Sequence, residues 1–264
     1  MKELMRNDLQ FVLSRTPRDV RKLLQENRLF LAGGFIRATI AGEKPSDVDL
    51  LGGDKLVLEN LALKLTNERK GRSHKTDNAI TVIAPPRIPV QFILRWIYDD
   101  PEKLISEFDF TVVQAAIWWE PSDPPKDAIT DKSLGKWRSM CADDFYPDLA
   151  ARRLTYTHPI RHEDAGGSLL RVIKYMKRGY TIQAPSIAGV IARLIGALNL
   201  DRMQNEEIPS TVQRSFQNTH GTEDGIGKFI NEEWATPLLL ALLREVDPLV
   251  VIDGLDFIDE HQVV

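Results

Sequence analysis

The sequence predicts an α+β protein in which a head domain precedes an all-helical second domain. Short apolar segments of strand length alternate with amphipathic helical segments through the N-terminal half of the chain. From Asp148 onward, apolar residues recur at helical spacing almost to the C-terminus. The chain has 264 residues, enough for two modest domains. We therefore expect the head at residues 1–147 and a helical neck and body at residues 148–264.

The head is expected to begin with an amphipathic helix and to continue as short strands and helices. Apolar residues recur at helical spacing over residues 8–27, where Pro17 marks a break or a second start. Asp54 is suited to cap a following helix. The expected elements are a strand at 29–32, a helix at 35–41, a strand at 47–51, a helix at 55–68, and strands at 79–83 and 89–94.

The part of the chain beyond residue 100 has a less regular pattern before the helical region. A short helix is expected at 101–108, and the apolar run at 111–119 fits either a strand or a buried helix. Residues 130–140 are expected to be irregular or to form a weak hairpin. Helices are then expected at 148–155, 164–178, 185–198, 205–218, 222–233 and 235–245, before an acidic tail at 246–264.

Composition excludes several classes of protein. The net charge of −4 gives no global attraction to nucleic acid, so RNA would have to bind through a local basic patch. The single cysteine excludes a disulfide framework, and the five histidines lack the spacing of zinc ligands. The N-terminus lacks the apolar region of a secretion signal, and no apolar stretch is long enough to span a membrane. We expect a cytoplasmic protein with no membrane partner.

A glycine pair and a pair of aspartates predict a site for a nucleotide and a metal ion. Gly33 and Gly34 follow a short strand, and glycine lets backbone amides approach a phosphate closely. Asp47 and Asp49 alternate along the next strand, so both carboxylates point to one face, about 7 Å apart. Oxygen ligands of this kind suit a hard divalent cation. The combination indicates phosphoryl or nucleotidyl transfer.

Three blocks between residues 28 and 183 resemble the polymerase-β nucleotidyltransferase superfamily, in the branch of bacterial tRNA CCA-adding enzymes and poly(A) polymerases. The blocks are Gly33-Gly34-Phe35-Ile36-Arg37 with Asp47-Val48-Asp49; Phe108-Asp109-Phe110-Thr111 with Gln114-Ala115-Ala116; and Glu163-Asp164-Ala165, Leu169-Leu170-Arg171, Lys174-Tyr175 and Gly179-Tyr180-Thr181-Ile182. The resemblance implies a mixed sheet with flanking helices in the head and a helical neck behind it.

The resemblance also implies roles for individual residues. Asp47 and Asp49 would hold Mg²⁺, or Mn²⁺ in its place, and Asp109 would be a further catalytic acid unless it is an N-cap or a buried partner of an arginine. Arg37 would bind a phosphate or pair with a surface acid. The remaining nucleotide-binding residues would be Gly33, Gly34 and Arg153 at the triphosphate, and Arg171 and Lys174 at the base or the phosphates.

The sequence departs from the family pattern at three places. Gln91 stands where the family has a third carboxylate, and a neutral amide is a poorer ligand for a hard cation. Ala38 replaces an acid after the arginine, and Gly166-Gly167 interrupts the expected neck helix. Either two aspartates suffice, or Asp109 assists, or the site holds metal weakly and the chemistry is slow or lost.

The function predicted from the sequence is transfer of a nucleoside monophosphate from a nucleoside triphosphate such as ATP to a hydroxyl. The resemblance implies an RNA 3′ end, tRNA-like, as the acceptor. Protein nucleotidylation is the nearest enzymatic alternative. A catalytically degenerate module that binds nucleotide or RNA is the alternative from another class, and Gln91 and Ala38 are its support.

Overall fold

The computed structural model describes residues 1–122, 135–159, 165–196, 250–253 and 256–259. The chain divides into two compact units, Met1–Pro159 and Ile160–Val264. The boundary predicted after residue 147 falls inside α6 (Phe145–Ala150), which packs within the first unit, so the division lies later in the chain. The helices predicted at 205–218, 222–233 and 235–245 lie outside the described residues.

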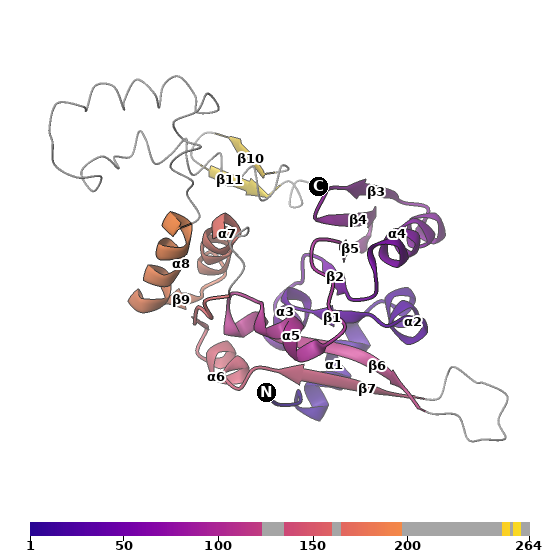
Figure 1. Ribbon diagram of the computed structural model, residues 1–264, viewed down its shortest axis with the longest axis horizontal. Helices are drawn as coiled ribbons and strands as arrows, with labels where there is room; N and C mark the ends of the chain where they lie inside the picture. Colours follow the sequence, from indigo (N-terminus) through magenta and orange to yellow (C-terminus); the bar gives the residue numbers. More distant parts are fainter. Residues whose placement is uncertain (123–134, 160–164, 197–249, 254–255, 260–264) are drawn as a thin grey trace, which may run out of the picture. The chain divides into compact units, whose positions relative to one another are not determined.

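The first unit is built on a seven-stranded sheet with the order β3-β4-β5-β2-β1-β6-β7 (Figure 1). The β2–β5 pair is parallel and the other neighbours are antiparallel, which confirms the predicted mixed sheet. The strands are β1 (Phe30–Ala32), β2 (Val48–Leu51), β3 (Arg72–Lys75), β4 (Ala79–Ala84), β5 (Arg87–Ile93), β6 (Ala115–Pro121) and β7 (Gly135–Cys141). A short segment β8 (Arg153–Leu154) follows α6.

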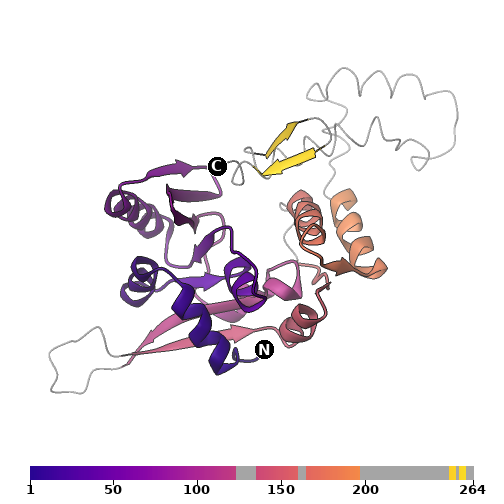
Figure 2. The same cartoon turned by 180° about the vertical axis from the view of Figure 1, so that it is seen from behind.

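Helices cover both faces of this sheet. Those of the first unit, besides α6, are α1 (Arg6–Arg15), α2 (Arg18–Glu26), α3 (Gly34–Ile40), α4 (Lys55–Arg69), α5 (Pro101–Ser106) and the 3₁₀ turn η1 (Thr111–Val113). In Figure 2, which shows the molecule from behind, helices α1, α2 and α4 lie in front of the sheet. Helix α5 covers the opposite face, which Figure 1 shows in front. On the α5 side, Leu104 and Ile105 pack against Ala32, Leu51 and their neighbours on the sheet.

Several local predictions are confirmed at the level of single residues. The Asp54 side chain caps α4 by accepting a hydrogen bond from the Val57 amide at 2.9 Å. Pro17 separates α1 from α2, as a second helix start would require. The ambiguous apolar run at 111–119 resolves into η1 followed by β6, because β6 pairs with strands on both sides.

In the described part of the second unit, α7 (Ala165–Met176) and α8 (Ala184–Gly196) pack on each other. Gly166 and Gly167 are buried within the first turn of α7, so the expected interruption of this helix is wrong. The unit also has short strands that the all-helical prediction did not include: β9 (Thr181–Ile182), and β10 (Val250–Asp253) paired antiparallel with β11 (Asp256–Asp259). Among the described helices, none combines the length and the apolar character needed to cross a bilayer.

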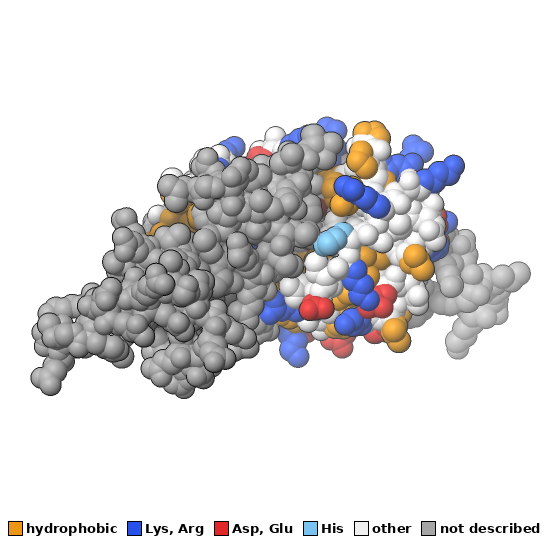
Figure 3. All heavy atoms as spheres, turned by 90° about the horizontal axis from the view of Figure 1, so that it is seen from above, with side chains coloured by type: hydrophobic (Ala, Val, Ile, Leu, Met, Phe, Trp, Pro, Cys, Tyr) orange, Lys and Arg blue, Asp and Glu red, His pale blue; other side chains and the backbone are white. Residues whose placement is uncertain are grey.

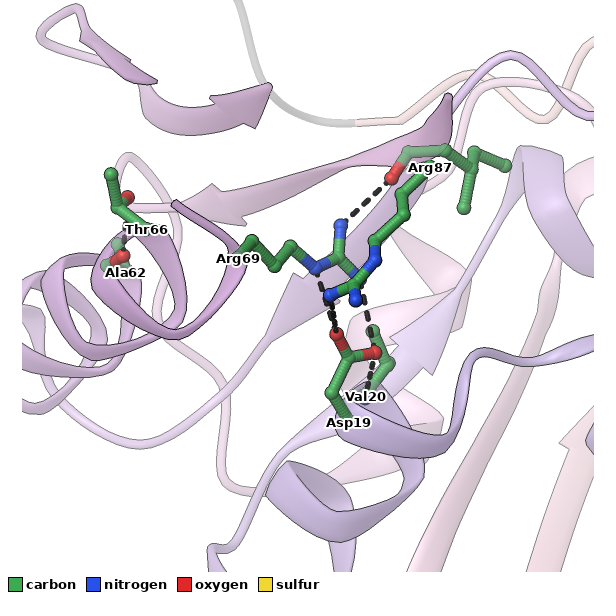
Figure 4. A network of polar contacts seen from close by, with 7 residues as sticks. Asp19, Val20, Ala62, Thr66, Arg69 and Arg87 are labelled. Carbon is green, nitrogen blue, oxygen red and sulfur yellow. Dashed lines mark hydrogen bonds and ion pairs between the residues drawn. The ribbon is translucent and has the colours of Figure 1, made fainter. Parts of the chain in front are cut away.

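A buried ion pair joins three elements on the α4 side of the sheet. The Arg69 guanidinium, fully buried, donates to both Asp19 oxygens at 2.8 and 3.1 Å and to the Ile88 carbonyl at 2.9 Å (Figure 4). Arg87 lies 3.6 Å from the same carboxylate. Partial burial raises the pKa of Asp19, but the hydrogen bonds and charge of Arg69, the Val20 amide and Arg87 outweigh it and hold this pKa below its ordinary value.

Replacing Asp19 by Asn should lower the free energy of unfolding by about 3 kcal/mol, since it leaves the buried Arg69 without a counter-charge. The depressed pKa of Asp19 means that its contribution is fully present above the unfolded-state pKa of about 3.9 and is lost as pH falls through the folded-state pKa. Urea unfolding at pH 7 and pH 3 measures both effects. Glu26→Gln, which removes two exposed ion pairs, with Lys22 and with Lys64, is the control and should cost less than about 1 kcal/mol.

Candidate active site

The two aspartates lie at the start of β2, as the sequence predicts. Asp47 is the residue before the strand and Asp49 is its second residue, and both are partly exposed. The Ser46 hydroxyl donates to Asp47 Oδ1 at 2.9 Å, which orients that carboxylate. Val48 and Leu50, which point to the opposite face, are fully buried. The alternation along β2 therefore directs Asp49 away from the face on which Val48 and Leu50 are buried, whereas Asp47 lies just before the strand.

The register of the sheet sets Gln91 beside Asp49. The two residues are partners in the parallel β2–β5 pair, and partners in register share a face at a strand spacing of about 4.8 Å. On its other side Asp49 is opposite Ala32 of β1. The position at which the family resemblance implies a third carboxylate is thus adjacent to Asp49, and it holds a neutral amide.

The glycine pair forms the turn from β1 into α3. Gly33 has φ of +77°, a conformation that side chains rarely adopt, and its amide donates to the Ala115 carbonyl at 3.0 Å. The role of Gly33 is therefore to allow the backbone conformation of the turn, because its N–H already donates to Ala115 and is not available to a phosphate. A Cβ placed on Gly34 would meet no heavy atom within 4 Å, so space remains open beside this residue.

Replacing Gly34 by Ala should leave the melting temperature unchanged or raise it, because the methyl group meets no neighbour and favours a helical residue. If that space receives the triphosphate, the affinity for Mg²⁺-ATP should fall about tenfold. Calorimetric titration with thermal unfolding measures both. Gly33→Ala is the contrasting variant and should lose about 1–2 kcal/mol of stability through its positive φ. Unchanged nucleotide affinity in Gly34→Ala would remove this glycine from the site.

Asp109 lies in a segment that packs against the glycine turn. Its side chain is 4 % exposed, and its carbonyl accepts a hydrogen bond from the Thr157 amide at 3.0 Å. A Cβ on Gly33 would lie 3.5 Å from the ring of the preceding Phe108. The fold therefore brings the second sequence block next to the first. A catalytic role for Asp109 stays a prediction.

Arg37 is held in an ion pair inside the first unit. Its side chain is 1 % exposed, and its Nη1 lies 2.5 Å from Glu43 Oε2. The other Glu43 oxygen lies 3.8 Å from Arg152. Of the two roles that the sequence leaves open for Arg37, the structure shows pairing with an acid. Phosphate binding by Arg37 stays a prediction.

Arg153 is bonded to a buried carboxylate that the sequence does not single out. Its Nε and Nη2 lie 2.7 and 2.6 Å from Asp148 Oδ1, and Asp148, 1 % exposed, also accepts a hydrogen bond from the Thr111 hydroxyl. The Arg153 side chain is nonetheless 39 % exposed, which leaves part of the guanidinium to solvent. Asp148 thus fixes the position of Arg153 and links it to the Phe108–Thr111 block.

Arg171 and Lys174 belong to the second unit and are three residues apart on α7, both half-buried. Helix α7 ends at Met176, two residues beyond Lys174. Glu163 and Asp164, which belong to the same sequence block, lie outside the described residues.

The donor set on the sheet fits one hard cation better than two. Among the described residues, no group of three or more His, Cys, Asp or Glu side chains is arranged to hold a metal. Asp49 and Gln91 share a sheet face and Asp47 lies just before the strand, so two carboxylates and an amide oxygen would be the oxygen ligands for a cation here. Mg²⁺ accepts such a set together with substrate phosphates, and the neutral third ligand lowers the charge that attracts it.

Sequence reasoning missed Glu43 and Asp148. Each is an isolated acid in a loop or a short helix, and each becomes meaningful only through an arginine that the fold brings to it. The sole signal in the sequence is that Arg37 and Arg153 each have an acid within six residues. Such spacing is common among surface residues and indicates no site by itself.

The order of strands, the glycine turn and the adjacent Asp-x-Asp strand define a nucleotidyltransferase-like fold. A solved CCA-adding enzyme in complex with CTP has the same fold, with a TM-score of 0.50 at 16 % identity over 91 % of this chain and 56 % of that one. The Thermotoga maritima CCA-adding enzyme complexed with tRNA gives a TM-score of 0.48 at 17 % identity, over 92 % of this chain and 56 % of that one. This chain spans little more than half the length of these enzymes.

The family assignment is more specific than the fold. The model of the Gabija anti-defense 2 family matches residues 3–152, so the chain belongs to that family. The match covers the sheet, the glycine turn and both aspartates. No curated protein matches the sequence.

Proposed function

We propose that this protein is a metal-dependent nucleotidyltransferase that moves a nucleoside monophosphate from a nucleoside triphosphate to a hydroxyl acceptor. The observation that carries the proposal is the register of β1 on β2. Ala32, opposite Asp49, leads directly into Gly33, so the turn suited to a triphosphate adjoins the strand suited to a cation. Phosphates and a divalent metal are needed together in this reaction.

In the proposed reaction, the acceptor oxygen forms a bond to the α-phosphorus while the bond from that phosphorus to the bridging oxygen breaks. Pyrophosphate leaves, and the hydroxyl proton passes to solvent or to a carboxylate. Bound Mg²⁺ would supply positive charge to the phosphate oxygens and acidify the attacking hydroxyl. Asp47 and Asp49 would hold the cation, with the Gln91 amide oxygen as a third ligand. Gly34 leaves room for the triphosphate.

The acceptor we propose is an RNA 3′ hydroxyl. Its support is the order and content of the three sequence blocks that resemble CCA-adding enzymes. A second candidate is nucleotidylation of a protein component of the Gabija defense, and its support is the description of the matching family as Gabija anti-defense. In both cases the nucleotide, the metal and the residues that hold them are the same.

Incubation with Mg²⁺ and each α-labelled ribonucleotide, with and without bulk RNA, tests the proposal. Label transferred to RNA and lost in Asp47→Ala supports the RNA acceptor. Label transferred to protein in a lysate of cells that carry the Gabija system, again lost in Asp47→Ala, supports the second candidate. Nucleotide binding without transfer to either acceptor would instead identify a degenerate binding module.

A further inference from the structure

The edge strand β3 carries a concentration of basic residues. Its sequence is Arg-Ser-His-Lys, and all four side chains are exposed. In the described sheet β3 pairs with β4 on one side only, so its outer edge is unpaired. Seen from above, Lys and Arg side chains are spread over the described surface, with a histidine among them (Figure 3). The sequence analysis expects no strand between residues 68 and 79, so β3 enters the argument only through the structure.

The basic residues of β3 divide between the two faces of the sheet. His74 is opposite Thr81 of β4, and Thr81 is opposite Gln91 of β5, which is the partner of Asp49. Arg72 alternates with His74 and shares its face. Both therefore lie on the face of the sheet that carries Asp49, with His74 three strand spacings, about 14 Å, from Asp49.

Lys75 points to the other face, toward α4. Its Nζ lies 3.0 Å from Glu59 Oε1. Arg72 and His74 have no ion pair with any residue in the described ranges. One strand thus presents a neutralised cation on its helix side and unneutralised basic groups on the side of the candidate active site.

The geometry of in-line transfer decides which side of Asp49 the acceptor occupies. The attacking oxygen and the leaving pyrophosphate lie on opposite sides of the reacting phosphorus. The glycine turn lies on the β1 side of Asp49, so a triphosphate over that turn directs pyrophosphate toward β1. The attacking hydroxyl then lies on the β5 side, over Gln91 and toward β3.

We propose that the Arg72/His74 side of β3 binds the phosphate backbone of a single-stranded RNA whose 3′ end reaches Asp49 across β4 and β5. The inference rests on the proposed function, because it takes Asp49 as the reaction centre. Basic side chains about 14 Å or more from Asp49 fit the backbone of the nucleotides that precede the 3′ terminal residue. The net charge of −4 makes such a local surface necessary, since the chain as a whole does not attract RNA.

Fluorescence anisotropy with a 5′-labelled single-stranded oligoribonucleotide, without nucleotide or metal, tests this surface. Relative to the wild type, the double variant Arg72→Ala/His74→Ala should raise the dissociation constant for RNA about tenfold. The slope of log K against log salt concentration should also decrease by about the amount expected for the loss of one phosphate contact. Lys75→Ala removes a cation of the same strand from the opposite face. It should change the dissociation constant less than about twofold.

Three results would overturn the proposal: wild-type affinity in the Arg72/His74 variant, an equal loss in Lys75→Ala, or no RNA binding by the wild type at low salt. Its failure is distinguishable from failure of the proposed function. Suppose that the Arg72/His74 variant binds RNA normally and that label transfer still depends on Asp47. The proposed transferase function would then stand, and the proposal for this RNA-binding surface would fail. Weakened RNA binding by the Arg72/His74 variant, with no label transfer by the wild type, would support this RNA-binding surface and contradict the transferase.

Discussion

Replacement of Asp49 by Asn is expected to lower nucleotide incorporation at least about a thousandfold while the protein stays folded. Asn keeps the shape of the side chain but removes one of two carboxylate charges from the face where the metal would bind. Loss of a metal ligand at such a site costs about 4 kcal/mol of transition-state stabilisation. Incorporation of labelled nucleotide measures the activity, and Mn²⁺ binding by electron paramagnetic resonance measures the site without turnover.

The matched control for this variant is Asp54→Asn. Asp54 is an exposed aspartate only five residues away that caps α4, and Asn caps a helix as well as Asp does. This variant should therefore keep both stability and activity. If Asp49→Asn retained more than a tenth of the wild-type incorporation and bound Mn²⁺ as tightly, the metal would have to lie elsewhere.

Replacement of Gln91 by Glu should strengthen metal binding about tenfold, and incorporation at limiting Mg²⁺ should rise with it. Position 91 is the register partner of Asp49, so the new carboxylate lies beside Asp49 on one face and adds a third acidic side chain to the set formed by Asp47 and Asp49. The gain should be greatest below saturating Mg²⁺ and should shrink at high Mg²⁺. Titration with Mn²⁺ and with Mg²⁺ in the activity assay checks both parts.

Gln25→Glu is the control for the added charge, because Gln25 is exposed on α2. It should leave metal affinity unchanged. Unchanged metal affinity in Gln91→Glu as well would mean that the side chain at position 91 takes no part in holding the cation. The two aspartates would then form the site without it.

The sequence predicted well those features that depend on neighbours along the chain. The period of two along β2 placed Asp49 opposite the face on which Val48 is buried, and the Asp54 cap follows from a local hydrogen bond. The positive φ of Gly33 is likewise a local property that only glycine accepts without strain. The strand β3 was not predicted, because an exposed Arg-Ser-His-Lys segment has no apolar alternation and becomes a strand only by pairing with β4.

The sequence by itself determined the head and neck order of this protein, the glycine turn and the paired aspartates, because periodicity, capping and turn conformation act over a few residues. Only the tertiary structure decided that Gln91 is the neighbour of Asp49, that Glu43 and Asp148 hold Arg37 and Arg153, and that β3 shares a face with the aspartates. These contacts depend on strand register and on charged groups brought together by packing. No short-range pattern encodes either.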